Sequence, residues 1–343
     1  MKKLLNTLYV VTPSSYLALE GETVMVCREE KTAMKLPLHN LEAIITFGYT
    51  GASPALMGAC AKRNINLSFL TPNGRFMARV VGESQGNVTL RKEQYRRSDS
   101  EENSCQIAKN FVFGKIHNAK WILERATRDH GLRIDVARVK TASAHLSEML
   151  AMVRLCDNLE TLRGIEGKAA VLYFGVLDQL ILQQKDAFYF NGRNKRPPLD
   201  NFNALLSFTY TLLASDCAAA LEAVGLDAYV GFLHRDRPGR TSLALDLMEE
   251  LRGVMADRFV ISLINKKEIK GNGFQKKENG AVQMNDETRK TVLMAWQEKK
   301  KEEIVHPFLK EKVAWGLISH LQAMLLSRFL RGDLDGYPPF LWK

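Results

Sequence analysis

The first 95 residues of the chain carry short hydrophobic runs separated by turn residues. Each run is four to seven residues long, and many contain the β-branched and aromatic residues that favour strands. Turn residues lie between the runs, as in Glu20-Gly21-Glu22 and Pro72-Asn73-Gly74, and Asn-Gly accepts the positive φ of a tight hairpin turn. The pattern predicts strands over residues 8–11, 16–19, 23–26, 41–47, 65–70 and 75–81.

One helix is predicted inside this strand-rich region. Ser53 can accept a hydrogen bond from the first helical turn, and Pro54 suits the first helical position, where no backbone N–H is needed. Residues 55–62 are mostly good helix formers. We expect this helix to interrupt the strands.

A polar, highly charged segment at residues 91–103 separates this region from the remainder of the chain. From Cys105 onward hydrophobic residues recur three to five positions apart, and long runs rich in leucine and alanine occupy 166–184 and 203–224. Runs of that length favour helices over strands. The sequence therefore predicts an α+β protein of two domains. A β-sandwich-like domain is expected at 1–95, a linker at 96–104 and a mainly α-helical domain at 105–343.

Two further segments are open to more than one interpretation. Lysines cluster over 266–277, followed by the turn signal Glu278-Asn279-Gly280, which suggests a small hairpin. These lysines could contact nucleic acid or form a solvated surface. The aromatic tail at 336–342 could bind a partner, but a frayed terminus is the simpler expectation.

The composition adds a preference for polyanionic partners. The 343 residues include 48 lysines and arginines against 38 acidic residues, a formal net charge of +10. A basic excess attracts phosphate backbones, although a merely basic soluble enzyme would have the same balance.

The five cysteines are scattered without a Cys-x-x-Cys pair, which argues against a disulfide framework or a structural zinc site. The hydrophobic start is too short for a signal peptide. No run of about 20 apolar residues suggests a membrane span. We expect a cytoplasmic protein.

The most informative polar residues lie in a predicted helix that follows Pro238-Gly239. Asp246 and Glu249 are three positions apart and so share one face, in a segment otherwise rich in leucine. Carboxylates beside such a run need a compensating cation, and a divalent ion such as Mg²⁺ or Mn²⁺ suits their oxygens. The alternative is a wet helix face on which both pair with Arg252 or Arg235.

Two more residues extend this candidate site. His234 could join carboxylates around Mn²⁺ or Mg²⁺, although a lone histidine can also be structural. Arg235, Arg237 and Arg240 follow it within six positions, and guanidinium groups match phosphate oxygens. Glu166 lies in a short glycine-flanked segment at the start of a predicted helix, where an acidic residue is also favoured by the helix dipole.

Three segments together resemble the CRISPR-associated adaptation endonuclease/integrase family Cas1, most closely its subtype I-C form. They are Arg163-Gly164-Ile165-Glu166-Gly167, PLDNFNALLSFTY at 198–210, and HRDRPGRTSLALDLMEELR at 234–252. The resemblance extends over essentially the whole chain. It implies an N-terminal β-sandwich-like domain that dimerises and a C-terminal helical domain that carries the metal.

The resemblance also implies a set of site residues. The family's metal ligands fall on Glu166, His234 and Glu249, the last in place of the family's more frequent aspartate. Asp246 matches a nearby acidic position that contacts the metal through water or stabilises the site. Asn203, Ser207 and Tyr210 match a motif between the ligands, for which packing is the simpler role.

The activity implied is the insertion of short double-stranded DNA into a CRISPR array, part of antiviral defence. A 3′-hydroxyl attacks a phosphodiester with the help of Mg²⁺ or Mn²⁺, and water in place of the hydroxyl would give DNA cleavage. The implied partners are double-stranded and branched DNA, a second copy of the chain, and the small protein Cas2. The alternatives are a plain metal-dependent DNA nuclease and a non-catalytic DNA-binding scaffold whose acidic residues are structural.

Overall fold

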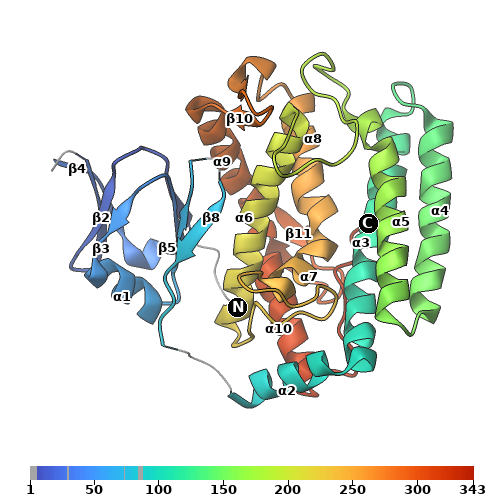
Figure 1. The fold of residues 1–343 in the computed structure, drawn as a ribbon, viewed down its shortest axis with the longest axis horizontal. Helices are drawn as coiled ribbons and strands as arrows, with labels where there is room; N and C mark the ends of the chain where they lie inside the picture. The colour runs from blue at the N-terminus through green and yellow to red at the C-terminus, as the bar shows by residue number, and fades with distance from the viewer. Residues whose placement is uncertain (1–5, 29–30, 73, 84–87) are drawn as a thin grey trace. The chain divides into compact units, whose positions relative to one another are not determined.

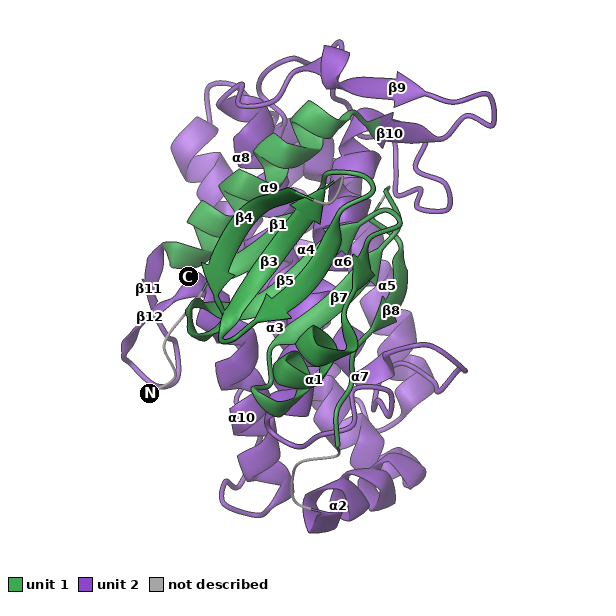
Figure 2. Ribbon diagram, turned by 90° about the vertical axis from the view of Figure 1, so that its left-hand side faces the viewer, with its two compact units in different colours: residues 1–85, 284–301 green, residues 86–283, 302–343 purple. Residues whose placement is uncertain are grey.

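The chain forms two compact units. The computed structural model describes residues 6–28, 31–72, 74–83 and 88–343. Unit 1 comprises Met1–Gln85 and Met284–Lys301, and unit 2 comprises Gly86–Gln283 and Glu302–Lys343. Figure 2 shows the strand-rich unit 1 in green and the largely helical unit 2 in purple. The predicted fold class, with strands first and helices after them, is confirmed.

Unit 1 contains two four-stranded sheets, in the orders β1-β5-β7-β8 and β4-β3-β2-β6. In the first, β1, β5 and β7 run parallel and β8 is antiparallel to β7. In the second, β2 to β4 form an antiparallel meander and β6 is parallel to β2. The strands are β1 (Asn6–Val10), β2 (Tyr16–Glu20), β3 (Thr23–Arg28), β4 (Lys31–Pro37), β5 (Leu41–Phe47), β6 (Gly51–Ala52), β7 (Asn66–Leu70) and β8 (Phe76–Arg79), with a 3₁₀ turn, η1, at Leu38–Asn40.

One hydrophobic core joins both sheets to helix α1 (Pro54–Lys62). Leu17, Val24, Ile44, Leu56 and Leu67 are fully buried in it. Burying an aliphatic side chain of this size stabilises a fold by roughly 1.5–3 kcal/mol. These contacts hold the two sheets and the helix together.

The predicted helix cap and the turn at Gly21 are both present in this unit. The Ser53 hydroxyl accepts a hydrogen bond from the Leu56 amide at 3.2 Å, and Pro54 begins α1. Gly21 has φ +58° in the turn between β2 and β3. Of the turn predicted at 72–74, Asn73 lies outside the described residues.

Helix α9 (Asp286–Lys301) belongs to unit 1 although it is far away in sequence. Trp296 is fully buried, and the ammonium of Lys300 contacts Glu42 Oε1 at 2.9 Å. Arg289 donates to the Pro72 carbonyl at 2.5 Å. Residues Met284–Lys301 therefore do not belong to the helical domain expected at 105–343. The sequence could not indicate this, because local periodicity carries no information about long-range contacts.

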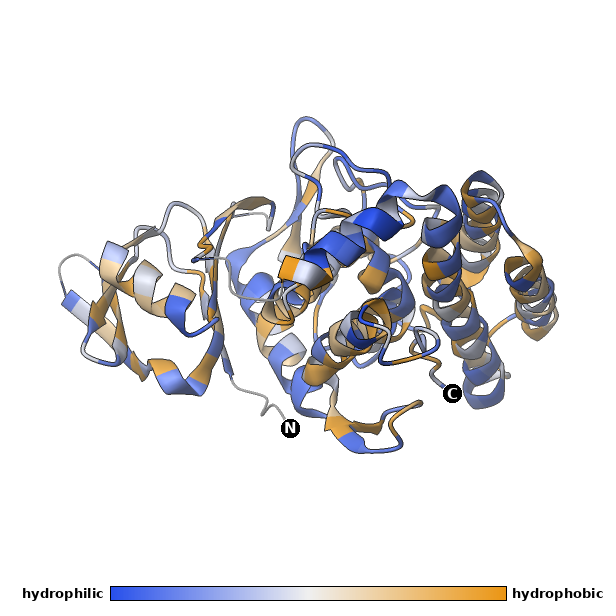
Figure 3. Ribbon diagram, turned by 90° about the horizontal axis from the view of Figure 1, so that it is seen from below, coloured by the Kyte–Doolittle hydropathy of each residue, from blue (hydrophilic) through white to orange (hydrophobic). Residues whose placement is uncertain are grey.

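Unit 2 is built mainly from helices, and α3, α4 and α5 lie side by side in it (Figure 1). Figure 3 shows that these helices carry hydrophobic and hydrophilic residues together, as amphipathic helices do. The helices are α2 (Val88–Asp99), α3 (Glu101–His130), α4 (Val136–Leu155), α5 (Leu159–Leu177), α6 (Asn201–Ala223), α7 (Ser242–Leu251), α8 (Arg258–Asn265) and α10 (Ile318–Leu330). A π-helical turn, η3, covers Arg252–Asp257 between α7 and α8.

Short elements complete the chain. β9 pairs with β10, and β11 pairs with β12. The first pair confirms the small hairpin predicted after the lysine cluster, with Gly280 at φ +80° in its turn. The elements are β9 (Phe274–Lys276), β10 (Val282–Met284), β11 (Glu303–Val305), β12 (Lys312–Ala314) and the 3₁₀ turns η2 (Asp178–Leu180), η4 (Gly271–Gly273) and η5 (Trp315–Leu317).

The predicted linker at 96–104 differs from the structure. These residues form the end of α2, its junction and the first turn of α3, where the Ser100 hydroxyl accepts a hydrogen bond from the Asn103 amide at 3.3 Å. α2 is also anchored within unit 2, because fully buried Gln94 donates to the carbonyls of Asp227 and Val230, each at 2.8 Å. The high charge of residues 96–104 therefore belongs to the exposed faces of two helices and does not mark a linker.

The C-terminal tail is packed rather than frayed, contrary to expectation. Tyr337, Phe340 and Trp342 are buried. The Phe340 amide donates to Glu250 Oε2 at 2.7 Å, and the Trp342 amide donates to Asn118 Oδ1 at 2.8 Å. Buried polar partners in α3 and α7 therefore fix a segment that looks like a loose terminus in the sequence.

Helix α6 is long and apolar enough to cross a membrane by length and composition. However, 67% of its most apolar 18-residue window is buried inside the protein. Core helices of globular proteins have the same properties, and the buried share supports that interpretation. No other such helix occurs among the residues that the structure describes.

Candidate metal and nucleic-acid site

Helix α7 carries the two carboxylates identified by their spacing. It begins after a turn in which Gly239 has φ +72°, a conformation that favours glycine. Thr241 is the N-cap residue but makes no side-chain capping bond, while the Ser242 hydroxyl donates to the Arg235 carbonyl at 3.1 Å. Both Asp246 and Glu249 are buried, so they do not lie on a wet helix face.

Asp246 holds the loop that carries His234. Its Oδ2 accepts hydrogen bonds from the amides of Phe232 and Leu233 at 2.7 and 2.9 Å. Its Oδ1 accepts one from the His234 amide at 3.0 Å and contacts His234 Nδ1 at 2.6 Å. A carboxylate partner on Nδ1 fixes the ring and leaves Nε2 available as a ligand.

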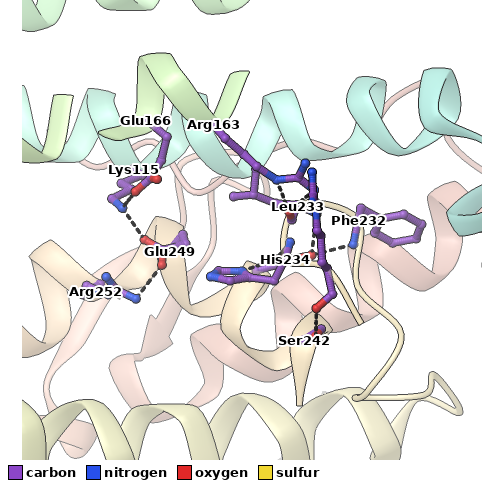
Figure 4. Close-up of polar contacts among 11 residues, drawn as sticks. Lys115, Arg163, Glu166, Phe232, Leu233, His234, Ser242, Glu249 and Arg252 are labelled. Atoms are coloured by element: carbon purple, nitrogen blue, oxygen red, sulfur yellow. Dashed lines mark hydrogen bonds and ion pairs between the residues drawn. The ribbon is translucent and has the colours of Figure 1, made fainter. Parts of the chain in front are cut away.

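Two other residues support this loop. Gly231 leaves no room for a side chain, because an added Cβ would lie 2.9 Å from Asp246 Oδ2. Arg163 on α5 donates to the Leu233 carbonyl from Nε and from a terminal nitrogen, at 3.0 and 2.8 Å. The loop is thus held from both α7 and α5, as Figure 4 shows for Arg163 and Leu233.

Four charged side chains form a row beside His234 (Figure 4). Lys115 on α3 contacts Glu166 Oε1 and lies 2.7 Å from Glu249 Oε2. Arg252 contacts the other oxygen of Glu249, Oε1, at 2.5 Å. The structure therefore brings Glu166, His234 and Glu249 from three distant parts of the chain to one place. Glu166 lies in the second turn of α5, which begins earlier than predicted, at Leu159.

The electrostatics of Glu249 follow from this row. Burial raises the pKa of its carboxyl, but the positive charges of Arg252 and Lys115 outweigh burial and lower the pKa to about 2. His234 acts in the same direction, and its ring lies beside Glu249 (Figure 4). The carboxylate is thus kept ionised in a buried place, the state that a metal ligand needs.

The donor types fit a hard divalent cation. Among the described residues, no three His, Cys, Asp or Glu side chains stand close enough to hold a metal ion in the present arrangement. The ammonium of Lys115 contacts both carboxylates instead. Yet Glu249 Oε2 is buried and accepts no well-formed hydrogen bond. Two carboxylates, one of them buried and held ionised, and an oriented imidazole suit Mg²⁺ or Mn²⁺.

An aromatic and cationic layer adjoins the row. The guanidinium groups of Arg252 and Arg193 lie 4.9 and 5.3 Å from the centre of the Tyr210 ring. Tyr210 and Tyr173 donate hydrogen bonds to fully buried Asp257, at 2.5 and 3.0 Å. Burial raises the pKa of Asp257, opposed by the Tyr210 hydroxyl and by Arg252. This layer fixes the position of Arg252.

The motif at Asn203, Ser207 and Tyr210 supports the same layer. Arg193 donates to Asn203 Oδ1 at 2.8 Å and to the Ser207 hydroxyl at 3.0 Å. Asn203 also donates to the Gly192 carbonyl at 2.9 Å. These residues hold the 192–194 loop, consistent with the architectural role expected from the sequence.

A group of cations lies next to this layer. The pKa of Lys195 is lowered by partial burial and then by the positive charges of Arg193, Arg252, Arg196 and Arg240. Burial and then Arg237 lower the pKa of Arg240, and the charge of Asp246 opposes them. No acidic group within ion-pair distance of Lys195, Arg196, Arg237 or Arg240 occurs in the described part of the chain. We call these four residues the unpaired cation cluster.

The three arginines predicted to bind DNA do not behave alike. Arg237 and Arg240 belong to the unpaired cation cluster. Arg235 contacts Glu160, with both side chains exposed. Arg235 therefore already has an acidic partner.

Sequence reasoning missed several residues of the site. Lys115, Arg193 and Asp257 carry no local motif, because their partners lie in distant parts of the chain. Lys195 was missed because its neighbouring cations come from several loops and helices. From the sequence, Arg252 is expected only as a partner of an exposed acidic pair. The one available signal was a charged residue within an otherwise hydrophobic helical stretch, as with Lys115 in Phe111 to Ile116.

Comparison with known proteins identifies the family. The family model described as CRISPR associated protein Cas1 matches residues 8–298. The CRISPR-associated endonuclease Cas1 1 of Chlorobaculum tepidum is 48% identical over 343 residues, covering 100% of both chains. The CRISPR-associated endonuclease Cas1 2 of Rhodospirillum rubrum is 51% identical over 347 residues, again covering 100% of both.

Solved structures share the fold. A CAS1 protein from Thermotoga maritima has a TM-score of 0.83 at 21% identity, covering 97% of this chain and 99% of that one. A casposase bound to an integration product also has a TM-score of 0.83, at 20% identity and with 99% and 95% coverage. The full-length similarity to the curated relatives and the family match together show that the chain belongs to the Cas1 family of CRISPR-associated proteins.

Proposed function

We propose that the protein is a metal-dependent DNA endonuclease and integrase of CRISPR adaptation. One observation carries this proposal: Glu166, Glu249 and the oriented ring of His234 converge beside a cluster of cations without acidic partners. Acidic ligands next to free cations suit a phosphodiester, which needs its charge neutralised at the reacting phosphate and along its backbone. The endonuclease names of the full-length relatives support the same conclusion.

The metal ligands would be Glu166, His234 through Nε2, and Glu249, with Mg²⁺ or Mn²⁺ as the cation. When bound, the cation supplies Lewis-acid stabilisation of charge on the phosphoryl oxygen. Asp246 orients His234 through Nδ1, so its role is to position a ligand rather than to contact the metal through water. Arg252 neutralises the second oxygen of Glu249 and keeps that carboxylate ionised.

The unpaired cation cluster would bind the DNA backbone. Lys195 and Arg196 come from the loop before α6, and Arg237 and Arg240 from the loop before α7. Contacts of this kind fix the strand without reading its sequence. Together they would lead a phosphodiester towards Glu249.

The partners proposed are double-stranded and branched DNA, a second copy of the chain through the N-terminal unit, and Cas2. Structures of similar fold include a Cas6-RT-Cas1–Cas2 complex, of which this chain would span 36% of the matched chain, with a TM-score of 0.80. Because that complex contains Cas2, Cas2 is the small partner proposed for this chain. The resemblance in the arginine-rich segment after His234 supports the subtype I-C form, and a cytoplasmic location follows from this role.

A strand-transfer assay tests the proposal. The protein, alone and with its cognate Cas2, is mixed with a labelled short duplex with free 3′ ends and a plasmid carrying the array, in Mn²⁺, Mg²⁺ or chelator. We expect joined products that require the metal and that disappear in Glu166→Gln. Metal-dependent cuts without joints would identify a plain nuclease. DNA binding without either product would identify a scaffold.

A further inference from the structure

Lys115 occupies an unusual place for a lysine. It lies on α3, its side chain is 15% exposed, and it contacts Glu166 on α5 and Glu249 on α7. Lysine is seldom buried without a specific partner, since its ammonium is strongly hydrated in water. Here the partners are two of the three residues assigned to the metal.

The position of Lys115 is imposed by helix packing. Gly114, its neighbour, allows α3 to approach α7 closely, because an added Cβ would lie 2.9 Å from the Cβ of Glu250. Asn118, one turn further along α3, donates to the Glu250 carbonyl at 2.7 Å. With α3 fixed against α7, the lysine side chain is directed at Glu249.

The single ammonium of Lys115 lies between two carboxylates. It makes a hydrogen bond to Glu166 and contacts Glu249 Oε2 at 2.7 Å. That oxygen is buried and accepts no well-formed hydrogen bond. One ammonium therefore keeps two like charges together at the place where a metal ion would bind.

The lysine ammonium also has a place to move to. A small hollow of about 30 Å³ adjoins Lys115, which is room for a group the size of a water molecule or an ammonium. The hollow is lined by Lys115, Ala119, Ala169, Tyr173, Arg252 and Asp257, among others. Small alanine side chains on α3 and α5 leave space beside the flexible lysine stem. Arg252, by contrast, is held against the Tyr210 ring, so it is not the cation that withdraws.

We propose that Lys115 is a resident counter-cation that holds Glu166 and Glu249 together without metal and withdraws when a divalent cation binds. Lys115 and the metal thus compete for the same two carboxylates, and the lysine sets the metal concentration at which the site fills. This inference rests on the proposed function, because it requires Glu166 and Glu249 to be metal ligands.

Titration of Mn²⁺ into the full-length protein tests this competition without any DNA reaction. Isothermal titration calorimetry and the loss of free Mn²⁺ signal in electron paramagnetic resonance are measured for wild type, Lys115→Met and Lys109→Met. Lys109 lies on the same helix, and its replacement removes the same charge away from the carboxylates. We expect Lys115→Met to bind Mn²⁺ about tenfold more tightly than wild type, since it loses both the competitor and a nearby positive charge. Lys109→Met should bind as wild type does.

The same variants give a second readout in thermal unfolding. Without metal, Lys115→Met should have a lower Tm than wild type, because Glu166 and Glu249 then repel each other. Saturating Mn²⁺ should raise its Tm by more than it raises that of wild type. If Lys115→Met does not fold without metal, folding recovered by Mn²⁺ in Lys115→Met and in Lys115→Gln supports the proposal.

Failure of the counter-cation role and failure of the metal site would give different results. Equal or weaker Mn²⁺ binding by Lys115→Met, with wild type binding at Glu166, would overturn the counter-cation role alone. Wild-type binding at Glu166 is established by its loss in Glu166→Gln. No Mn²⁺ binding by either wild type or Lys115→Met would overturn this inference and the metal site of the proposed function together.

Discussion

Asp246 Oδ1 accepts the backbone amide of His234 at 3.0 Å and contacts Nδ1 of the same residue at 2.6 Å. One oxygen thus fixes both the main chain and the ring of a residue twelve positions earlier. Its second oxygen binds two further amides of the loop. The position of His234 therefore depends on the buried Asp246 carboxylate, which contacts the loop amides and the imidazole directly.

Replacing Asp246 with asparagine should impair catalysis by misplacing His234. An asparagine side chain accepts hydrogen bonds only at its oxygen, and its nitrogen donates. It therefore cannot accept from three backbone amides and the imidazole together. Loss of such a ligand-orienting partner typically costs about 10- to 100-fold in metal affinity or activity. The initial rate of strand joining in Mn²⁺ measures the effect. Asp236→Asn, in the exposed part of the same loop, is the control, and full activity of Asp246→Asn would contradict this role.

Replacing Tyr337 with phenylalanine should destabilise unit 2. The Tyr337 hydroxyl donates to Glu250 and accepts from Gln322 Nε2 at 2.8 Å. Losing a buried hydrogen bond to a carboxylate costs about 1.5–3 kcal/mol in free energy of unfolding. Urea unfolding followed by circular dichroism measures the change, and Tyr189→Phe on an exposed tyrosine is the control. An unchanged free energy of unfolding would show that the tail contributes little.

His117 should make stability depend on pH in the acidic range. Burial lowers the pKa of this imidazole from 6.5 to about 4, and the charges of Lys343 and Lys120 act in the same direction. Between these two values the unfolded chain binds a proton that the folded chain does not, so stability is lost as the pH falls from 6.5 to 4.

His117→Gln tests this dependence, because it removes the titrating group. We expect the loss of unfolding free energy between pH 6.5 and pH 4 to shrink by about 1–2 kcal/mol, after allowance for partial exposure. Chemical unfolding at a series of pH values measures it, with exposed His145→Gln as the control for losing an imidazole. A pH profile identical to that of wild type would contradict the assignment.

Lys195→Gln and Arg240→Gln should weaken DNA binding and its dependence on salt. Each residue in the unpaired cation cluster that contacts a phosphate contributes about one unit to the slope of log affinity against log salt. Fluorescence anisotropy of a labelled duplex at several salt concentrations measures the slope. Exposed Lys312→Gln is the control for a lost charge elsewhere on unit 2, and equal slopes in all variants would place the DNA on another surface.

Local signals in the sequence predicted the elements that depend on neighbouring residues. The cap at Ser53 and Pro54 and the hairpin before α9 follow from short-range rules and are present. The three-residue spacing of Asp246 and Glu249 correctly placed them on one helix. Their partners could not be derived in this way, because spacing does not say what faces a helix.

Long-range contacts account for what the sequence did not predict. Lys115 lies 51 positions from Glu166, and nothing near it in the sequence indicates an ion pair. The tail has the composition of a loose end, but Glu250 and Asn118 bind its backbone. In each case a buried polar group satisfies a partner from a distant helix, which only the three-dimensional packing reveals.

Anomalous diffraction from crystals grown with Mn²⁺ would show whether Glu166, His234 and Glu249 bind the metal. We expect one strong anomalous peak within bonding distance of a Glu166 oxygen, His234 Nε2 and a Glu249 oxygen, with Lys115 turned away from both carboxylates. A peak elsewhere, or none at saturating Mn²⁺ with Lys115 still between Glu166 and Glu249, would contradict it.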